Sequence, residues 1–259
     1  MAIFATPLEV TLKYSLSNIL SLFIGGLFFI PPLVAYFFLI IAAELFEGNE
    51  YLFLALFGLL FVLIPVCVAL PGGYIIRCLR DRRTGSLRMP GFFGEPVKLL
   101  SDAFAFLVMA IVYMICFGLM FALLFTPIVF LPSSPTGFGF IAFIAFMFLF
   151  VALFAIVANV LFFTFFISLT IYAAEGSLIS ALNPVRVIKV LASNPLGFLV
   201  TLVLVYGIGS LLQILAIFLI TMPWVLFFIM LIDALVVADV YLATERKIGE
   251  PGLTDQPAP

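Results

Sequence analysis

Six apolar stretches dominate the sequence, and each is long enough to cross the hydrocarbon core of a membrane as a helix. A span needs about 20 predominantly apolar residues, because the core is about 30 Å thick and an α-helix rises 1.5 Å per residue. The stretches cover residues 18–43, 51–76, 103–131, 138–173, 198–221 and 223–243. The sequence therefore predicts an all-α, polytopic membrane protein with a single membrane domain over residues 18–245.

The composition also excludes a water-soluble protein. Apolar residues make up 66% of the chain and charged residues only 9%, against about 25% charged residues in soluble domains. The 33 phenylalanines would promote aggregation on a soluble surface, whereas they pack well against lipid. The charge pattern does not resemble a nucleic-acid-binding surface, so we expect no nucleic-acid partner.

The positive charges fix the expected orientation in the cell membrane. All eleven Lys and Arg residues fall in segments that share one side if the chain starts in the cytoplasm, and the opposite loops carry none. Cations near span ends resist translocation, so the pattern predicts that both termini are cytoplasmic. The cations are Lys13, Arg77, Arg80, Arg82, Arg83, Arg88, Lys98, Arg186, Lys189, Arg246 and Lys247.

Two further segments have the pattern of helices that lie at the inner interface. In residues 1–17, the Thr-Pro-Leu-Glu sequence of residues 6–9 has the form of a capping box with proline at the first helical position. The segment before the fifth stretch has one apolar stripe at helical spacing, and two cations lie outside that stripe. The stripe is Leu178, Leu182, Val185 and Ile188, and the cations are Arg186 and Lys189.

The fourth stretch is the ambiguous part of this topology. Its 36 residues would form a helix of about 54 Å, which is more than one span requires. A division near Asn159 would leave no polar turn and would move Arg186 and Lys189 to the outside. We expect one long helix that protrudes into the cytoplasm, or one that is bent or broken near Asn159. The polar residues 246–259 are expected to be a disordered tail.

The sequence contains no recognisable catalytic, metal or cofactor site. Histidine is absent, and Cys67, Cys78 and Cys116 lack the spacing of a zinc or haem site. A nucleophile paired with a base and a phosphate-binding loop are also missing. We therefore expect a protein without enzymatic activity, metal or cofactor.

Four polar residues within the apolar stretches form a candidate intramembrane site: Asp233, Asp239, Gln213 and Asn159. An isolated carboxylate there is costly and usually marks a lumen, a pair or a protonated state. Asp233 would either line a path or fix helix packing through a buried hydrogen bond, whereas Asp239 lies near the inner interface. The hydroxyls of the fourth stretch would line a polar cavity or bond within their helix. They belong to Thr164, Ser168 and Thr170.

The cations are also candidate contacts for the anionic lipids of the inner leaflet. Each cation near such a leaflet contributes about 1 kcal/mol, so the cluster between residues 77 and 98 could hold lipid headgroups. Simple topological anchoring is the alternative. The candidate contacts are Arg77, Arg80, Arg82, Arg83, Arg88, Lys98, Arg186 and Lys189.

Several short motifs after the second stretch resemble a known family. They are Gly72-Gly-Tyr-Ile-Ile-Arg77, Thr84-Gly85, Met89-Pro-Gly-Phe92 and Asp102 at the start of the next span. With these motifs the chain resembles the domain-of-unknown-function family 4013, whose members look like prokaryotic multi-span membrane proteins. The resemblance extends over nearly all of residues 10–245. It implies a membrane fold and carries no activity or catalytic residues.

Three functional hypotheses follow. The first is a non-enzymatic structural or accessory component that binds lipid, a partner membrane protein or a second copy of itself. The alternative is a small transporter, channel or lipid-handling protein that uses Asp233 and the polar groups of the fourth stretch. An enzyme that acts on lipid at the inner leaflet ranks third.

Overall fold

The computed structural model describes residues 2–45, 50–129, 138–216 and 221–249, and in this part of the chain all regular structure is helical. Each of the six predicted stretches overlaps one of six helical segments that are long and apolar enough to cross a membrane, so the all-α polytopic architecture is confirmed. The helices are α1 Ala2–Ser15, α2 Ile19–Leu27, α3 Ile30–Leu45, α4 Glu50–Arg83, α5 Pro96–Val129, α6 Phe138–Glu175, α7 Leu178–Ala181, α8 Pro184–Ser193, α9 Pro195–Ala216 and α10 Met222–Gly249.

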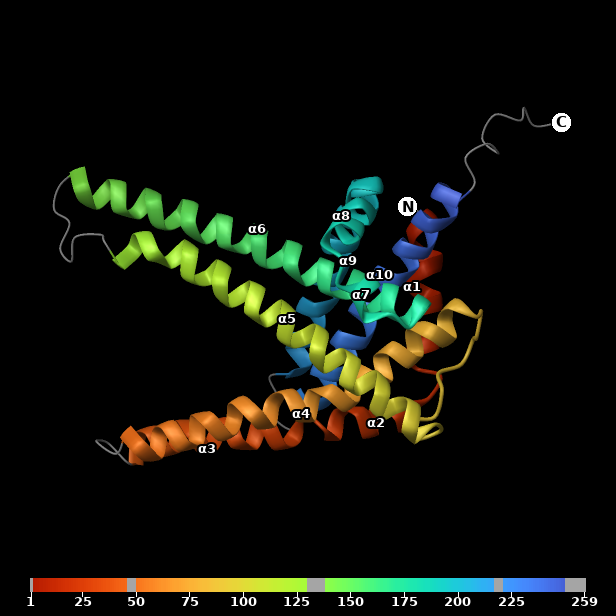
Figure 1. The fold of residues 1–259 in the computed structure, drawn as a ribbon, viewed down its shortest axis with the longest axis horizontal. Coiled ribbons are helices and arrows are strands. Elements are labelled where there is room, and N and C mark those ends of the chain that lie inside the picture. The colour runs from red at the N-terminus through yellow and green to blue at the C-terminus, as the bar shows by residue number, and fades with distance from the viewer. Residues whose placement is uncertain (1, 46–49, 130–137, 217–220, 250–259) are drawn as a thin grey trace.

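Two long helical hairpins diverge from a common base, as Figure 1 shows. One consists of α3 and α4 and the other of α5 and α6, while α10 contacts α1, α2, α4, α6 and α9 within the base. The hairpins are joined where α4 packs on α5 at Gly73. A Cβ atom on Gly73 would lie 2.4 Å from the backbone nitrogen of Ala103, so only glycine allows this approach.

The first span is divided into α2 and α3, which Phe28 and Phe29 separate. Helix α2 starts at Asn18, whose side chain accepts a hydrogen bond from the Ser21 amide at 3.1 Å. Its glycines face α10: Cβ atoms on Gly25 and Gly26 would each lie 2.3 Å from an aromatic ring of that helix. Close contact between α2 and α10 therefore depends on these two glycines.

The fourth stretch is one continuous helix. Helix α6 runs for 38 residues from Phe138 to Glu175 and has no interruption at Asn159, which resolves the alternatives in favour of a single helix. At 1.5 Å per residue its length is about 57 Å. Asn159 does not interrupt the helix, because its side-chain amide donates a hydrogen bond to the carbonyl of Ala155, one turn earlier, at 2.7 Å.

Some predicted boundaries were wrong. Helix α1 begins at Ala2, ahead of the predicted start at residues 6–9, because a capping pattern does not prevent a further turn from forming before it. Helix α10 continues to Gly249, so residues 246–249 of the predicted tail are helical. The rest of that tail and the predicted hairpin at 132–137 lie outside the described residues.

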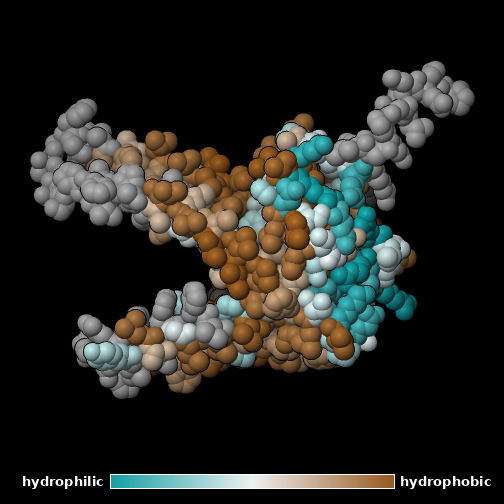
Figure 2. Space-filling view, in the orientation of Figure 1, coloured by the Kyte–Doolittle hydropathy of each residue, from teal (hydrophilic) through white to brown (hydrophobic). Residues whose placement is uncertain are grey.

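The polar surface gathers at the base of the molecule and the apolar surface covers the hairpins (Figure 2). The polar end includes the last turns of α4, the first turn of α5 and the end of α6, which carry most of the ion pairs described below. The ion-paired cations of α4, α5 and α8 therefore lie at one end of the fold.

Candidate functional site

A buried ion pair joins α4 to α5 at the polar end. The Arg80 guanidinium donates two hydrogen bonds to the Asp102 carboxylate, at 2.9 and 3.0 Å. Asp102 is only 2% exposed, and the Arg80 side chain is 25% exposed. This two-bond geometry is the strongest form of a carboxylate–guanidinium contact. Sequence reasoning treated Arg80 as a lipid contact and missed its partner, although Asp102 stands at the polar end of its span.

Asp239 links three helices at the same end. Its carboxylate accepts a hydrogen bond from the Thr11 hydroxyl of α1 at 2.9 Å and lies 3.4 Å from Arg82 Nε of α4. The Arg82 guanidinium also lies 5.7 Å above the Tyr14 ring. Burial raises the pKa of Tyr14, whose hydroxyl donates to the Cys78 carbonyl at 3.2 Å. Asp239 therefore holds α1 against the bundle.

Most of the candidate lipid-contact cations have carboxylate partners within the chain. Arg83 lies 3.8 Å from Glu245, and Arg186 pairs with Glu175. Arg77 and Lys98 share Glu95, at 3.6 and 3.4 Å. The described residues offer no ion pair to the remaining two, Arg88 and Lys189, and both are exposed. These two cations have charge available for an external anion.

Asp233 lies in the middle of α10, buried to 4% exposure in the base of the fold. Neither a hydrogen bond nor an ion pair reaches its carboxyl group from the described residues. No fully buried side-chain oxygen or nitrogen in that part of the chain lacks a partner, so the Asp233 oxygens keep a small contact with the surface. The Asp233 carboxyl group is thus largely buried, and no described residue forms a hydrogen bond or an ion pair with it.

The other predicted intramembrane groups do not converge on Asp233. Asn159 of α6 accepts a hydrogen bond from the Tyr206 hydroxyl of α9, and the side chain of Gln213 lies outside the described residues. The α6 hydroxyls bond within their helix or to the Tyr113 hydroxyl of α5, and they are Thr164, Ser168 and Thr170. These bonds support a packing role rather than a shared polar cavity.

Metal ligands do not cluster either. In the ranges that the structure describes, no group of three His, Cys, Asp or Glu residues is placed to hold a metal ion. The three cysteines are free, and Cys78 is fully buried.

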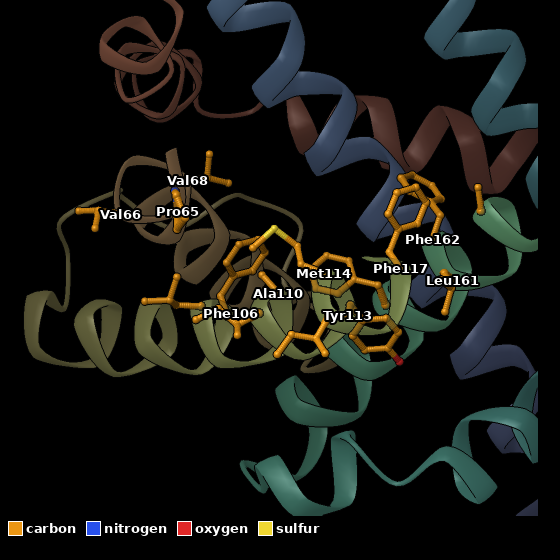
Figure 3. Close-up of a pocket in the computed structure, with 15 residues that line it drawn as sticks. Pro65, Val66, Val68, Phe106, Ala110, Tyr113, Met114, Phe117, Leu161 and Phe162 are labelled. Carbon is orange, nitrogen blue, oxygen red and sulfur yellow. The ribbon is translucent and has the colours of Figure 1, made fainter. Parts of the chain in front are cut away.

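An apolar groove of about 1050 Å³ lies between α4, α5 and α6, where the two hairpins diverge (Figure 3). Its one polar side chain is Tyr113, whose hydroxyl is engaged with the Thr164 carbonyl at 3.0 Å and Ser168 Oγ at 2.8 Å. Sequence analysis did not predict this groove, because the divergence of two hairpins leaves no local pattern. Its walls include Pro65, Val68, Phe106, Ala110, Met114 and Phe162.

The groove lies at hydrocarbon depth relative to the polar end. Ala110 follows Asp102 by eight residues of α5 and Phe117 follows it by fifteen, which places them about 12 and 22 Å along the helix axis. Both distances are less than the hydrocarbon thickness of about 30 Å. Measured from the polar end, the groove therefore falls within the length of a membrane-spanning helix.

Comparison with known proteins identifies a family for this chain. The family model described as Protein of unknown function (DUF4013) matches residues 56–221. No curated protein and no solved structure matches the chain. The matched residues contain the whole lining of the groove, whereas Asp233 and Asp239 lie beyond them. Since the match covers more than half of the 259 residues, the chain belongs to the DUF4013 family of multi-span membrane proteins.

Proposed function

We propose that this protein is a non-enzymatic accessory component of the cell membrane that binds phospholipid, with both termini in the cytoplasm. The groove between α4, α5 and α6 holds an acyl chain. The observation that carries this proposal is the large groove at hydrocarbon depth, whose lining is apolar except for Tyr113. A phospholipid is the ligand that a bilayer supplies to such a space at high concentration.

Physical chemistry favours an occupied groove. An apolar void leaves the atoms of its walls without dispersion contacts on one side. Water does not restore these contacts, because the Tyr113 hydroxyl is already engaged and offers no free polar partner. A flexible acyl chain restores them and can follow the irregular wall.

Aromatic contacts keep the walls of the groove in place. The Phe106 and Tyr113 rings each meet the Phe165 ring edge to face, with centroids 5.6 and 5.4 Å apart. Phe117 meets Phe154 in the same manner at 5.6 Å. Edge-to-face pairs of this kind stabilise a fixed arrangement. The groove therefore exists before the lipid enters, and binding requires little rearrangement.

Filling the groove tests the proposal. We expect Ala110→Trp and Ala158→Trp to reduce the phospholipid retained after delipidation about tenfold, which corresponds to about 1.4 kcal/mol of binding free energy. Retained lipid is measured by mass spectrometry of the purified protein. Both alanines line the groove, so indole rings there occupy the space of the acyl chain.

The matched control is Val203→Trp, at an exposed position of α9 outside the groove. It adds the same side chain to the membrane-facing surface and is expected to retain lipid as the unmodified protein does. Equal retention by all three variants would contradict the proposal. A change of oligomeric state confined to the two groove variants would also count against it, since a protein partner or a second copy would then occupy the groove.

Transport is the second candidate, and the burial of Asp233 without a partner among the described residues favours it. Under the lipid-binding proposal, Asp233→Asn leaves the retained lipid unchanged, because the amide has nearly the shape of the carboxyl group. It also leaves the proton flux unchanged, because the carboxyl group then carries no protons across the membrane. Proton flux is followed with a pH-sensitive dye in reconstituted vesicles. A flux in the unmodified protein that falls about tenfold in Asp233→Asn, equivalent to about 1.4 kcal/mol in the barrier, would support transport instead.

A further inference from the structure

Helix α8 lies across the inner ends of the spans rather than along them. It runs across the axis of α6 in Figure 1 and is tied at both ends, to α6 through α7 and to α9 at Pro195. Its start is fixed by Asn183, whose side chain accepts hydrogen bonds from the amides of Val185 and Arg186 at 3.1 and 3.4 Å. Because of these short connections, α8 stays at the level where α6 ends and α9 begins.

The helix has one apolar side on the protein and a second apolar edge that the fold leaves uncovered. Val187 is 2% exposed and, with Leu191, packs against the core. Val185 and Ile188 are 74% and 59% exposed. Water would be an unfavourable environment for two such side chains placed together, whereas the acyl chains just inside the interface suit them.

The exposed residues follow one another around α8 in order of polarity. Successive residues of a helix are about 100° apart, so Ile188 and Val185 occupy one edge of the exposed face. Ser193 lies about 140° from Ile188, at the opposite edge, and Lys189 lies between the two. The order from apolar through cationic to hydroxyl matches the order from acyl chains through phosphate to water.

Lys189 is the cation of α8 that remains available. Arg186 is engaged by Glu175, with Nη1 2.8 Å from Oε2, and these hydrogen bonds raise the pKa of Arg186. Lys189 is exposed and makes no ion pair with the residues that the structure describes. An external anion at this helix would therefore meet Lys189 rather than Arg186.

We propose that α8 lies in the plane of the inner leaflet, with Val185 and Ile188 among the acyl chains and the Lys189 amine on the phosphate of an anionic phospholipid. This surface is separate from the groove, so it does not depend on an acyl chain between the hairpins. A long cationic side chain beside an apolar edge is typical of helices that lie in a membrane interface.

A depth measurement tests the position of α8. With Cys67 and Cys116 replaced by alanine and the fully buried Cys78 retained, a fluorescent label is placed at Ile188→Cys or, as the matched control, at Ser193→Cys. In reconstituted vesicles, we expect nitroxides on lipid acyl chains to quench the Ile188 label and an aqueous quencher to reach the Ser193 label. Aqueous quenching of the Ile188 label, with no quenching by lipid nitroxides, would overturn the proposal.

A charge measurement tests the role of Lys189. The ratio of quenching by nitroxide-labelled phosphatidylglycerol to that by labelled phosphatidylcholine reports anionic lipid next to the Ile188→Cys label. We expect Lys189→Gln to lower this preference about fivefold, the effect of one cation near an anionic surface, and Lys189→Arg to preserve it. Lys13→Gln is the control, because its amine is already paired with Glu9 at 2.6 Å. An unchanged preference in Lys189→Gln would contradict the contact.

Discussion

Replacing Arg80 by alanine is expected to lower the free energy of unfolding by about 3–5 kcal/mol, because it leaves a buried carboxylate without its partner. Asp102 is 2% exposed and receives both hydrogen bonds of this pair from Arg80. The pair also lies where the first turns of α5 pack on α4, so its loss loosens the base of both hairpins. Unfolding of the purified protein in mixed micelles, followed by circular dichroism, measures the effect.

The double variant Arg80→Met with Asp102→Leu is the control. It removes both charges together, and replacing a buried ion pair by apolar residues of similar volume is often neutral or stabilising. We therefore expect it to be more stable than Arg80→Ala. A single variant whose unfolding free energy stayed within about 1 kcal/mol of the unmodified protein, the range of a surface pair, would show that the ion pair does not hold the base together.

The second large effect is expected at Gly73, where Gly73→Ala should destabilise the fold by about 1–3 kcal/mol or more. The added Cβ would lie 2.4 Å from the Ala103 nitrogen and 2.8 Å from the Leu99 carbonyl oxygen. Both are backbone atoms of α5 and cannot move aside as a flexible side chain would. The two helices must then separate along their shared face, which thermal unfolding in detergent would detect.

Gly58 provides the matched control in the same helix. No described atom lies within 4 Å of a Cβ added there, and alanine is favoured over glycine within a helix by about 1 kcal/mol. Gly58→Ala is therefore expected to be neutral or stabilising. Equal effects of the two substitutions would mean that helix propensity, and not the contact between α4 and α5, decides the outcome at Gly73.

Features that depend on local pattern were predictable from the sequence. The spans follow from apolar length, and helical structure before the fifth span follows from its apolar stripe, although the structure divides that stripe between α7 and α8. The gathering of cations at one end follows from their absence in the opposite loops. Each of these features depends on whether a short segment is more stable in lipid or in water, and the composition of the segment determines this.

Features that depend on distant contacts were not predictable. Thr11 and Asp239 are separated by 228 positions, and Arg80 finds Asp102 only because α4 and α5 pack through Gly73. Six of the eight proposed lipid-contact cations also have a carboxylate partner in the fold, and four of these partners lie on another helix. The groove likewise forms because the two hairpins diverge, and the sequence of a single segment does not predict the angle between them.

The membrane topology is tested most directly by determining on which side of the membrane the polar end lies. A cysteine in place of Thr84, an exposed residue just beyond α4, is treated with a membrane-impermeant maleimide in the Cys67→Ala, Cys116→Ala background. We expect labelling in inside-out vesicles and none in intact cells. Labelling in intact cells would reverse the orientation and contradict the inner-leaflet assignment of α8, the cytoplasmic termini and the charge argument together.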